Sequence, residues 1–127
     1  MSNLIIEDLK DSILKITLNN PTQQNTLSLQ FINDLKKIFE NADSNDEIKV
    51  IILSSSGKVF SAGHNLKEIK SHRQDKDQGL QFFKDLINSC SDLMLKITNN
   101  SKPVIAEVNG IATAAGCQLV ASCDLAY

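Results

Sequence analysis

The stretch VIILSSSGKVFSAGHNLKEI (residues 50–69) joins an apolar run, a loop of small residues and the start of a helical pattern. The run Ile48–Ser54 is nearly continuously apolar, which predicts a strand buried on both faces, as in a parallel sheet. The same order returns in VIAEVNGIATAAGCQLV (residues 104–120), where we expect a strand at Pro103–Val108 and a helix at Ala114–Ser122. Strand–loop–helix repeats of this kind predict an α/β fold.

Two longer segments repeat apolar residues at helical spacing. One runs from Ser28 to Ala42, and the other from Leu80 to Ile97. Both patterns predict amphipathic helices. Ser28 is the expected N-cap of the first, because a serine side chain can accept a hydrogen bond from a free N–H at a helix start.

The N-terminal part of the chain predicts a β-hairpin. Leu4–Glu7 is a short apolar strand, Asp8–Asp11 is a break, and Ser12–Asn19 alternates apolar and polar residues as a half-buried strand does. Further along, Asp43–Asp46 is expected to form a polar turn, and Asp124–Tyr127 has the pattern of the start of one more strand.

The composition is that of an ordinary globular protein. The 127 residues carry a net charge of −2, with 42% hydrophobic and 22% charged residues, and no Lys/Arg stripe indicates nucleic acid. No apolar run approaches the roughly 18 residues that span a bilayer. The N-terminus has neither a signal-peptide nor a transit-peptide pattern. We therefore expect a cytoplasmic protein without a nucleic-acid or membrane partner.

Three cysteines, Cys90, Cys117 and Cys123, occur without any C-x-x-C spacing. Their odd number and apolar settings predict reduced, buried thiols in a reducing compartment. No second histidine or carboxylate stands at metal-ligand spacing from His64, and His72 lies in a polar stretch. We therefore predict no metal site.

The two small-residue loops, Ala62-Gly63 and Ala114-Ala115-Gly116, admit two interpretations. A helix start presents free N–H groups and the positive end of the helix dipole, and small residues let a ligand approach that backbone. Two such loops on adjacent strands, each offering one N–H to the same oxygen, would form an oxyanion hole. The alternative is that the small residues only permit close helix–strand packing. Neither loop spells G-x-G-x-x-G or a Walker loop.

Three motifs resemble the crotonase (enoyl-CoA hydratase/isomerase) superfamily. They are NNPTQQNTLS (residues 19–28), VFSAGHNLKEI (residues 59–69) and KPVIAEVNGIATAAGCQLVASCDLAY (residues 102–127). They follow one another at family-like spacing and cover most of the chain. The resemblance implies the N-terminal half of a spiral of ββα units, so that residues 1–127 would form a partial crotonase-like acyl-CoA-binding domain.

The resemblance also implies a substrate and a site. The substrate would be an acyl-CoA thioester, whose oxygen would accept hydrogen bonds from the backbone N–H groups of His64 and Ala115. No tightly bound cofactor is implied, since coenzyme A enters as part of the substrate. The family forms trimer-based homo-oligomers. The adenine and ribose of CoA would rest near Gln23–Asn25 and on the loop Ala62–Leu66, which makes the expected contacts Gln24, Ala62, Gly63, His64, Asn65 and Leu66.

Gln118 departs from the family pattern. Hydratases of this family have a glutamate here that holds and activates water. Glutamine keeps nearly the same shape and can hold a water, but it cannot take a proton at neutral pH. General acid–base assistance contributes roughly 10²–10⁴-fold in rate, so the exchange argues against hydratase activity. The alternative interpretation is a glutamine that only solvates or caps a helix.

His64-Asn65 is a second departure, because many relatives have a small residue followed by aspartate. Asn65 can still cap the short helix expected after it, and His64 has no partner that would make it a base. Glu107 is the single carboxylate in an apolar strand near the site. Because burying it unpaired would be costly, we expect it at a sheet edge or paired with a lysine, with a role as substitute acid as the alternative.

The family's second catalytic acid lies downstream of Gln118, beyond Tyr127. The sequence therefore leaves three functions open. The first is an enzyme of fatty-acid and acyl-CoA metabolism, a lyase or isomerase that works through an enolate-like intermediate. The second is a non-catalytic acyl-CoA binder or regulator. The third is a remnant that needs a partner chain.

Overall fold

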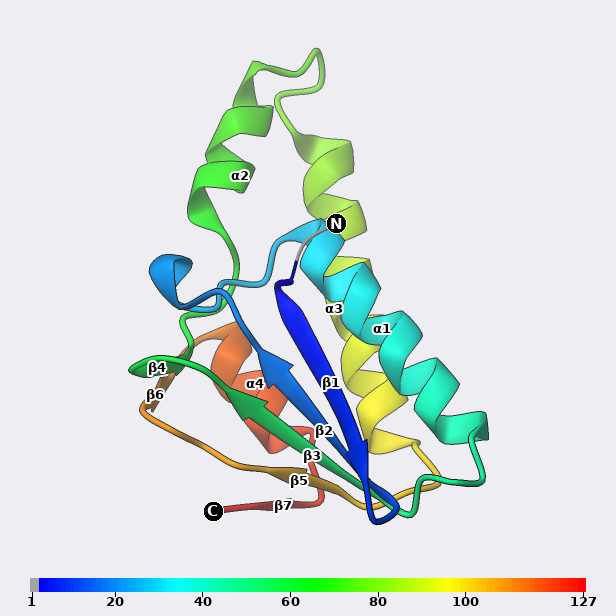
Figure 1. Cartoon of the computed structure of the whole chain (residues 1–127). Helices are drawn as coiled ribbons and strands as arrows, with labels where there is room; N and C mark the ends of the chain where they lie inside the picture. Colours follow the sequence, from blue (N-terminus) through cyan, green and yellow to red (C-terminus); the bar gives the residue numbers. More distant parts are fainter. Residues whose placement is uncertain (1–2) are drawn as a thin grey trace.

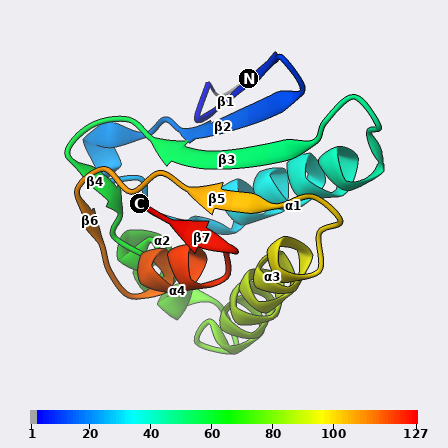
Figure 2. The same cartoon turned by 90° about the horizontal axis from the view of Figure 1, so that it is seen from below.

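The computed structural model describes residues 3–127 and shows a curved sheet with helices packed on one face (Figures 1 and 2). The sheet has five strands in the order β1-β2-β3-β5-β7. All neighbouring pairs are parallel except β1 and β2. The strands are β1 (Ile5–Lys10), β2 (Ile13–Leu18), β3 (Val50–Ser55), β5 (Val104–Ala106) and β7 (Leu125–Ala126).

Two further strands form a small second sheet at one end of the first. They are β4 (Val59–Ser61) and β6 (Ile111–Ala112), and they pair in parallel. The α-helices are α1 (Leu29–Ser44), α2 (Leu66–Ser71), α3 (Leu80–Thr98) and α4 (Ala115–Ala121), and short 3-10 helices occur at Pro21–Gln23 and His72–Gln74. The order of elements confirms the predicted α/β class. The sequence pattern missed β4 and β6, which are too short to show a period.

The predicted hairpin is present, but the predicted break at Asp8–Asp11 is wrong. β1 continues through Asp8, which pairs with Lys15 across the two strands. An exposed edge strand tolerates such polar residues, because its side chains face water. The turn is confined to Asp11 and Ser12, whose φ angles of 53° and 66° match the two-residue hairpin turn that fits strand twist.

The core lies between the sheet and the long helices α1 and α3. The sheet contributes buried side chains from two of its inner strands, namely Leu14, Ile16 and Leu18 of β2 and Ile51 and Leu53 of β3. From the helices come Phe31, Leu35, Phe39, Leu86, Leu93 and Ile97. Each such side chain stabilises the fold by roughly 1.5–3 kcal/mol relative to leaving it exposed. Both predicted amphipathic helices are confirmed within two residues at each end.

β3 is the centre of the parallel arrangement, with β2 on one side and β5 on the other. This confirms the predicted strand in a parallel sheet. The predicted burial on both faces is wrong, because helices cover only one face of the sheet and Val50 and Ile52 are half-buried. The other sheet face carries a polar cluster around Glu107, which follows β5. The Glu107 carboxylate accepts hydrogen bonds from Lys15 Nζ at 3.3 Å, Ser54 Oγ at 3.0 Å and the Tyr127 hydroxyl at 2.8 Å. The expected lysine partner of Glu107 is therefore Lys15.

These hydrogen bonds lower the pKa of the Glu107 carboxyl, with the Tyr127 hydroxyl as the largest cause, followed by Ser54 and then Lys15. A carboxyl that holds its charge so well is a poor proton donor. The alternative role of Glu107 as a substitute acid therefore has no support from its surroundings.

The cysteines only partly match the prediction of buried thiols. Cys90 is buried, Cys123 is half-buried, and Cys117 is exposed on α4, so the prediction is wrong for Cys117. Burial raises the pKa of the Cys90 thiol. Burial, with a further contribution from Asp124, raises the pKa of Cys123 to about 12. Within residues 3–127, no helix is both long enough and apolar enough to cross a membrane.

Ser28 caps α1 as expected, because its side chain accepts a hydrogen bond from the Phe31 N–H at 3.2 Å. We predict that Ser28→Ala lowers the free energy of unfolding by about 1 kcal/mol, the usual worth of an N-cap. Urea denaturation measures this. Ser44→Ala, at the other end of the same helix, is the control and should change stability by less than about 0.5 kcal/mol. Equal losses in the two variants would contradict the capping role.

Glu107 predicts an acid-dependent loss of stability. Its folded-state pKa lies below the ordinary value of 4.5, so the cluster stabilises the fold above that pH. The contribution is lost as the pH falls from 4.5 through the lowered pKa. In denaturation curves across this range, the stability of Glu107→Gln should fall less steeply with acid than that of the parent. The slope of stability against pH for Tyr127→Phe should lie between those of the parent and Glu107→Gln. Identical slopes in all three proteins would show that the cluster does not stabilise the ionised form of Glu107.

Candidate functional site

The two small-residue loops meet at one end of the parallel sheet. β4 lies in the first loop and β6 in the second, and Val59 pairs with Ile111 and Ser61 with Ala112. Gly63 follows β4 and packs against the start of α4. A methyl group added to Gly63 would lie 2.9 Å from the Cβ of Ala114 and 3.1 Å from the backbone nitrogen of Ala115. The structure therefore brings together the two loops that the sequence singled out.

Two backbone N–H groups beside this contact are unengaged. Ala115 is the first residue of α4, so its N–H has no partner within the helix. His64 directly follows Gly63. Across residues 3–127, neither of these two N–H groups donates to a protein acceptor. Among the described residues, the protein therefore leaves both donors without an acceptor.

The loop that carries His64 is held by backbone hydrogen bonds to the segment after β2. The Ala62 N–H donates to the Gln24 carbonyl at 3.0 Å, and the Leu27 N–H donates to the Gly63 carbonyl at 2.7 Å. Asn65 then caps α2, as expected, because its side chain accepts a hydrogen bond from the Glu68 N–H at 3.2 Å. The loop is thus fixed at both ends.

Ala114 adopts an unusual backbone conformation, with φ 52° and ψ −127°. Residues with a side chain rarely adopt a positive φ, and such strain costs on the order of 1–3 kcal/mol. A positive φ at Ala115 would have strained the residue that carries the expected donor. The structure has the positive φ at Ala114 instead, so Ala115 begins a regular helix.

A hollow of about 340 Å³ lies beside the His64 loop. Five of the six expected contacts line it, namely Gln24, Ala62, His64, Asn65 and Leu66. Gly63 is buried behind it. Thr22, Gln23, Thr26 and Lys67 complete the wall. Lys67 was not among the predicted contacts, although a cation directly after a loop expected to hold part of CoA was a usable signal.

Gln118 lies apart from this hollow. It is exposed on α4, one turn after Ala115, and its backbone N–H donates to the Ala114 carbonyl at 3.1 Å. No protein group in the described part of the chain bonds to its side chain. Gln118 and Ala115 therefore both belong to α4. The side-chain amide of Gln118 makes no hydrogen bond to residues 3–127 and is exposed to water.

The His64 imidazole lacks the surroundings of a catalytic base. Its Nδ1 atom is buried and has no hydrogen-bond partner among residues 3–127, so no carboxylate orients the ring. The same described residues contain no group of three His, Cys, Asp or Glu side chains that would hold a metal ion. The expected role of the His64 backbone N–H stays a prediction.

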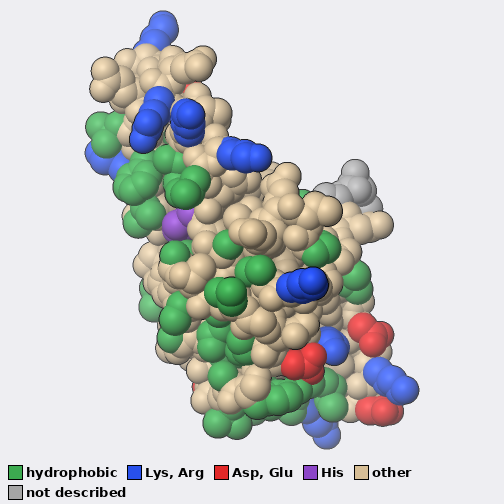
Figure 3. Space-filling view, turned by 90° about the vertical axis from the view of Figure 1, so that its left-hand side faces the viewer, with side chains coloured by type: hydrophobic (Ala, Val, Ile, Leu, Met, Phe, Trp, Pro, Cys, Tyr) green, Lys and Arg blue, Asp and Glu red, His purple; other side chains and the backbone are tan. Residues whose placement is uncertain are grey.

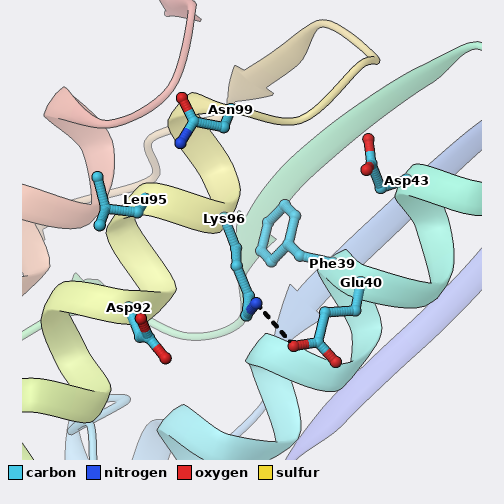
Figure 4. Close-up of a pocket in the computed structure, with 7 residues that line it drawn as sticks. All are labelled: Phe39, Glu40, Asp43, Asp92, Leu95, Lys96 and Asn99. Carbon is cyan, nitrogen blue, oxygen red and sulfur yellow. Dashed lines mark ion pairs between the residues drawn. The ribbon is translucent and has the colours of Figure 1, made fainter.

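A second hollow, of about 270 Å³, lies between α1 and α3 (Figure 4). Lys96 Nζ pairs there with Glu40 Oε1 at 2.8 Å, which raises the pKa of Lys96. Asp43 accepts a hydrogen bond from the Ser101 N–H, which lowers its pKa. Asp92 is also paired, with Lys36 at 3.2 Å, so the charged groups of this hollow are all engaged. None of its residues belongs to the three motifs. We therefore assign no function to it.

Gly63 should not tolerate a side chain. Its φ is +91°, and a methyl group would press on Ala114 and Ala115. We predict that Gly63→Ala costs about 1–3 kcal/mol in chemical denaturation and shifts the amide resonances of residues 113–116. Gly79→Ala is a matched control, with φ +86° and an equally close contact on His72. It should lose similar stability and leave residues 113–116 unchanged. Unmoved resonances in Gly63→Ala would contradict the contact between the loops.

Comparisons with known proteins agree with this architecture. The family model described as enoyl-CoA hydratase/isomerase matches residues 8–127. The human mitochondrial enoyl-CoA hydratase domain-containing protein 3 is 50% identical over 117 residues, which are 91% of this chain and 37% of that protein. The zebrafish (Danio rerio) protein of the same name is 48% identical over 126 residues, covering 98% of this chain and 42% of its own length.

Solved structures show the same fold. The crystal structure of human enoyl Coenzyme A hydratase domain-containing protein 3 superposes with a TM-score of 0.87 at 43% identity, over 97% of this chain and 47% of the other. An enoyl-CoA hydratase/isomerase from Marinobacter aquaeolei gives 0.88 at 28% identity, over 98% and 48%. The chain spans less than half the length of these relatives and matches the N-terminal half of the crotonase fold. It belongs to the enoyl-CoA hydratase/isomerase family.

Proposed function

We propose that this chain binds an acyl-CoA thioester and polarises its carbonyl through the backbone N–H groups of His64 and Ala115. The observation that carries the proposal is the contact of Gly63 with the start of α4, beside two N–H groups without protein acceptors. Hydrogen bonds from fixed donors favour the charge that develops on such an oxygen. Each donor of this kind is worth roughly 10²–10³ in rate.

The hollow beside the His64 loop would hold the CoA moiety. Gln24, Thr26 and Asn65 offer polar groups to a nucleotide. Lys67 adds a positive charge at the wall. Lys and Arg side chains also gather at the end of the molecule that carries α2 (Figure 3). This charge suits the phosphates of CoA, since a cation is attracted to phosphate even from an exposed position.

Gln118 limits which reaction the site can run. Its amide can hold a water or a substrate group, but it cannot accept a proton. A site that polarises the thioester but has no proton acceptor should hydrate an enoyl-CoA weakly or not at all. The first candidate is thus an enzyme of acyl-CoA metabolism that acts through an enolate-like intermediate. Gln118 favours a second candidate, a non-catalytic acyl-CoA binder or regulator.

A homo-oligomer is also part of the proposal, as is the alternative that the site is completed by another chain. Several large apolar side chains are exposed, and burying them would stabilise an assembly. They include Leu80 and Phe83 of α3 and Leu125 and Tyr127 near the last strand. The relatives' names place them in mitochondria, whereas the sequence pattern predicts the cytoplasm. We propose a reducing compartment, which suits the three free cysteines in either case.

Calorimetric titration of the chain with crotonyl-CoA tests the proposal, with free CoA as the control. We predict that the thioester binds roughly 5- to 150-fold more tightly, because two added hydrogen bonds contribute roughly 0.5–1.5 kcal/mol each. Sedimentation at the same concentrations defines the assembly that binds. Equal affinities for crotonyl-CoA and free CoA would contradict the role of the two N–H groups. If neither ligand binds, the proposal is wrong for this chain.

Gln118→Glu separates the two candidate functions. With a proton acceptor restored, we expect measurable hydration of crotonyl-CoA where the parent shows little, followed as loss of the enoyl-thioester absorbance. Asn41→Asp, exposed in the last turn of α1, makes the same charge change away from both loops and should leave the rate unchanged. If Gln118→Glu adds no turnover while thioester binding persists, the non-catalytic binder is the better description.

A further inference from the structure

We propose that Ser61 and Asn25 are positioning residues that orient the two backbone donors. The inference rests on the proposed function and deepens it. Both side chains are fully buried, with an exposed fraction of 0%, and neither lines the hollow. Their role would therefore be indirect, through the backbone of Gly63 and of the loop before α4.

The Ser61 hydroxyl acts as both a hydrogen-bond donor and an acceptor. It donates to the Asn25 carbonyl at 2.8 Å and accepts from the Gly63 N–H at 3.2 Å. Only a hydroxyl, which is donor and acceptor at one atom, can bridge a carbonyl and an N–H in this way. The bridge pins the N-terminal side of Gly63, the most flexible residue type in the loop.

The C-terminal side of Gly63 is pinned by the hydrogen bond from the Leu27 N–H to the Gly63 carbonyl. A trans peptide is planar, so its carbonyl and the following N–H point in opposite directions. Because the Gly63 carbonyl faces Leu27, the His64 N–H must face away from it. The direction of this donor is therefore set by Gly63, and Gly63 is held from both sides.

Asn25 fixes the carbonyl on which the Ser61 hydroxyl rests. Its Nδ2 donates to the carbonyls of Ser56 at 2.9 Å and Val59 at 2.8 Å. Its Oδ1 accepts from the Asn20 N–H at 2.7 Å. Both hydrogens of the amide and its oxygen are thus engaged, and the backbone of Asn25 is held at φ 50°. The side chain joins the segment after β2 to the loop that enters β4.

Ser61 also reaches the second donor. Its carbonyl accepts a hydrogen bond from the Thr113 N–H at 3.1 Å. Gly116, in the first turn of α4, packs so closely on the same carbonyl that no side chain would fit there. Ser61 is therefore bonded through its hydroxyl to the His64 loop and through its carbonyl to the loop before Ala115. This single residue links the placement of both donors.

The test compares Ser61→Ala with Ser54→Ala in the full chain. Ser54 is the control, because it is also a buried serine, but its hydroxyl bonds to the Glu107 carboxylate on the other sheet face and to neither loop. The probe is 4-aminocinnamoyl-CoA, whose absorption moves to longer wavelength when its thioester oxygen is polarised. We expect Ser61→Ala to lose most of this shift and about tenfold in thioester affinity, while its affinity for free CoA stays unchanged. Ser54→Ala should behave like the parent.

Ser61→Cys keeps the size of the side chain but offers only a weak donor and acceptor. It should retain part of the shift, and it decides the question if Ser61→Ala does not fold. A full shift in Ser61→Ala or, if that variant is unfolded, in Ser61→Cys would overturn the positioning role. Equal losses for free CoA and the thioester would also overturn it, because they indicate general damage. No shift in the parent would instead refute the proposed function, and the inference with it.

Discussion

The close contact of Gly63 with the start of α4 is the constraint on which the site depends. It requires a residue without a side chain at 63, and it requires that β4 and β6 lie side by side. The pairing of these two short strands follows from β3 and β5, which are parallel neighbours and therefore deliver their loops to the same end of the sheet. The buried core thus determines where two backbone N–H groups point.

Polar bonds within the loops stiffen this arrangement. Asn25, Ser61 and the carbonyl of Gly63 form a continuous set of hydrogen bonds across three segments that are distant in the sequence. Buried polar groups of this kind are costly when unsatisfied and rigid when every partner is present. Rigid donors are what polarising a carbonyl needs, because they need no reorganisation as charge develops.

Much of the fold could be predicted from the sequence, since α1, α3 and β3 carry strong periodic or continuous apolar patterns. The short strands β4 and β6 could not, because two or three residues show no period and their pairing depends on the tertiary structure. The meeting of the two small-residue loops was predicted from their motifs, while the roles of His64, Ala115 and Gln118 stay predictions. The Ser61 bridge was missed, since a serine in a small-residue loop gives no sign of its partners. Lys67 was missed because charged residues on a helix are usually only solvated.

Gln118 shows why the placement of donors and the transfer of protons can be separated in this fold. The two N–H groups belong to the backbone, so they depend on the positions of residues 64 and 115 and hardly on their side chains. Proton transfer would depend on one side chain, and the amide of Gln118 cannot accept a proton at neutral pH. Ala114, which precedes Ala115, adopts a strained φ of 52°. Such strain persists only where the surrounding structure imposes it, so the proposed position of the Ala115 donor is set by its packing and needs no proton acceptor at residue 118.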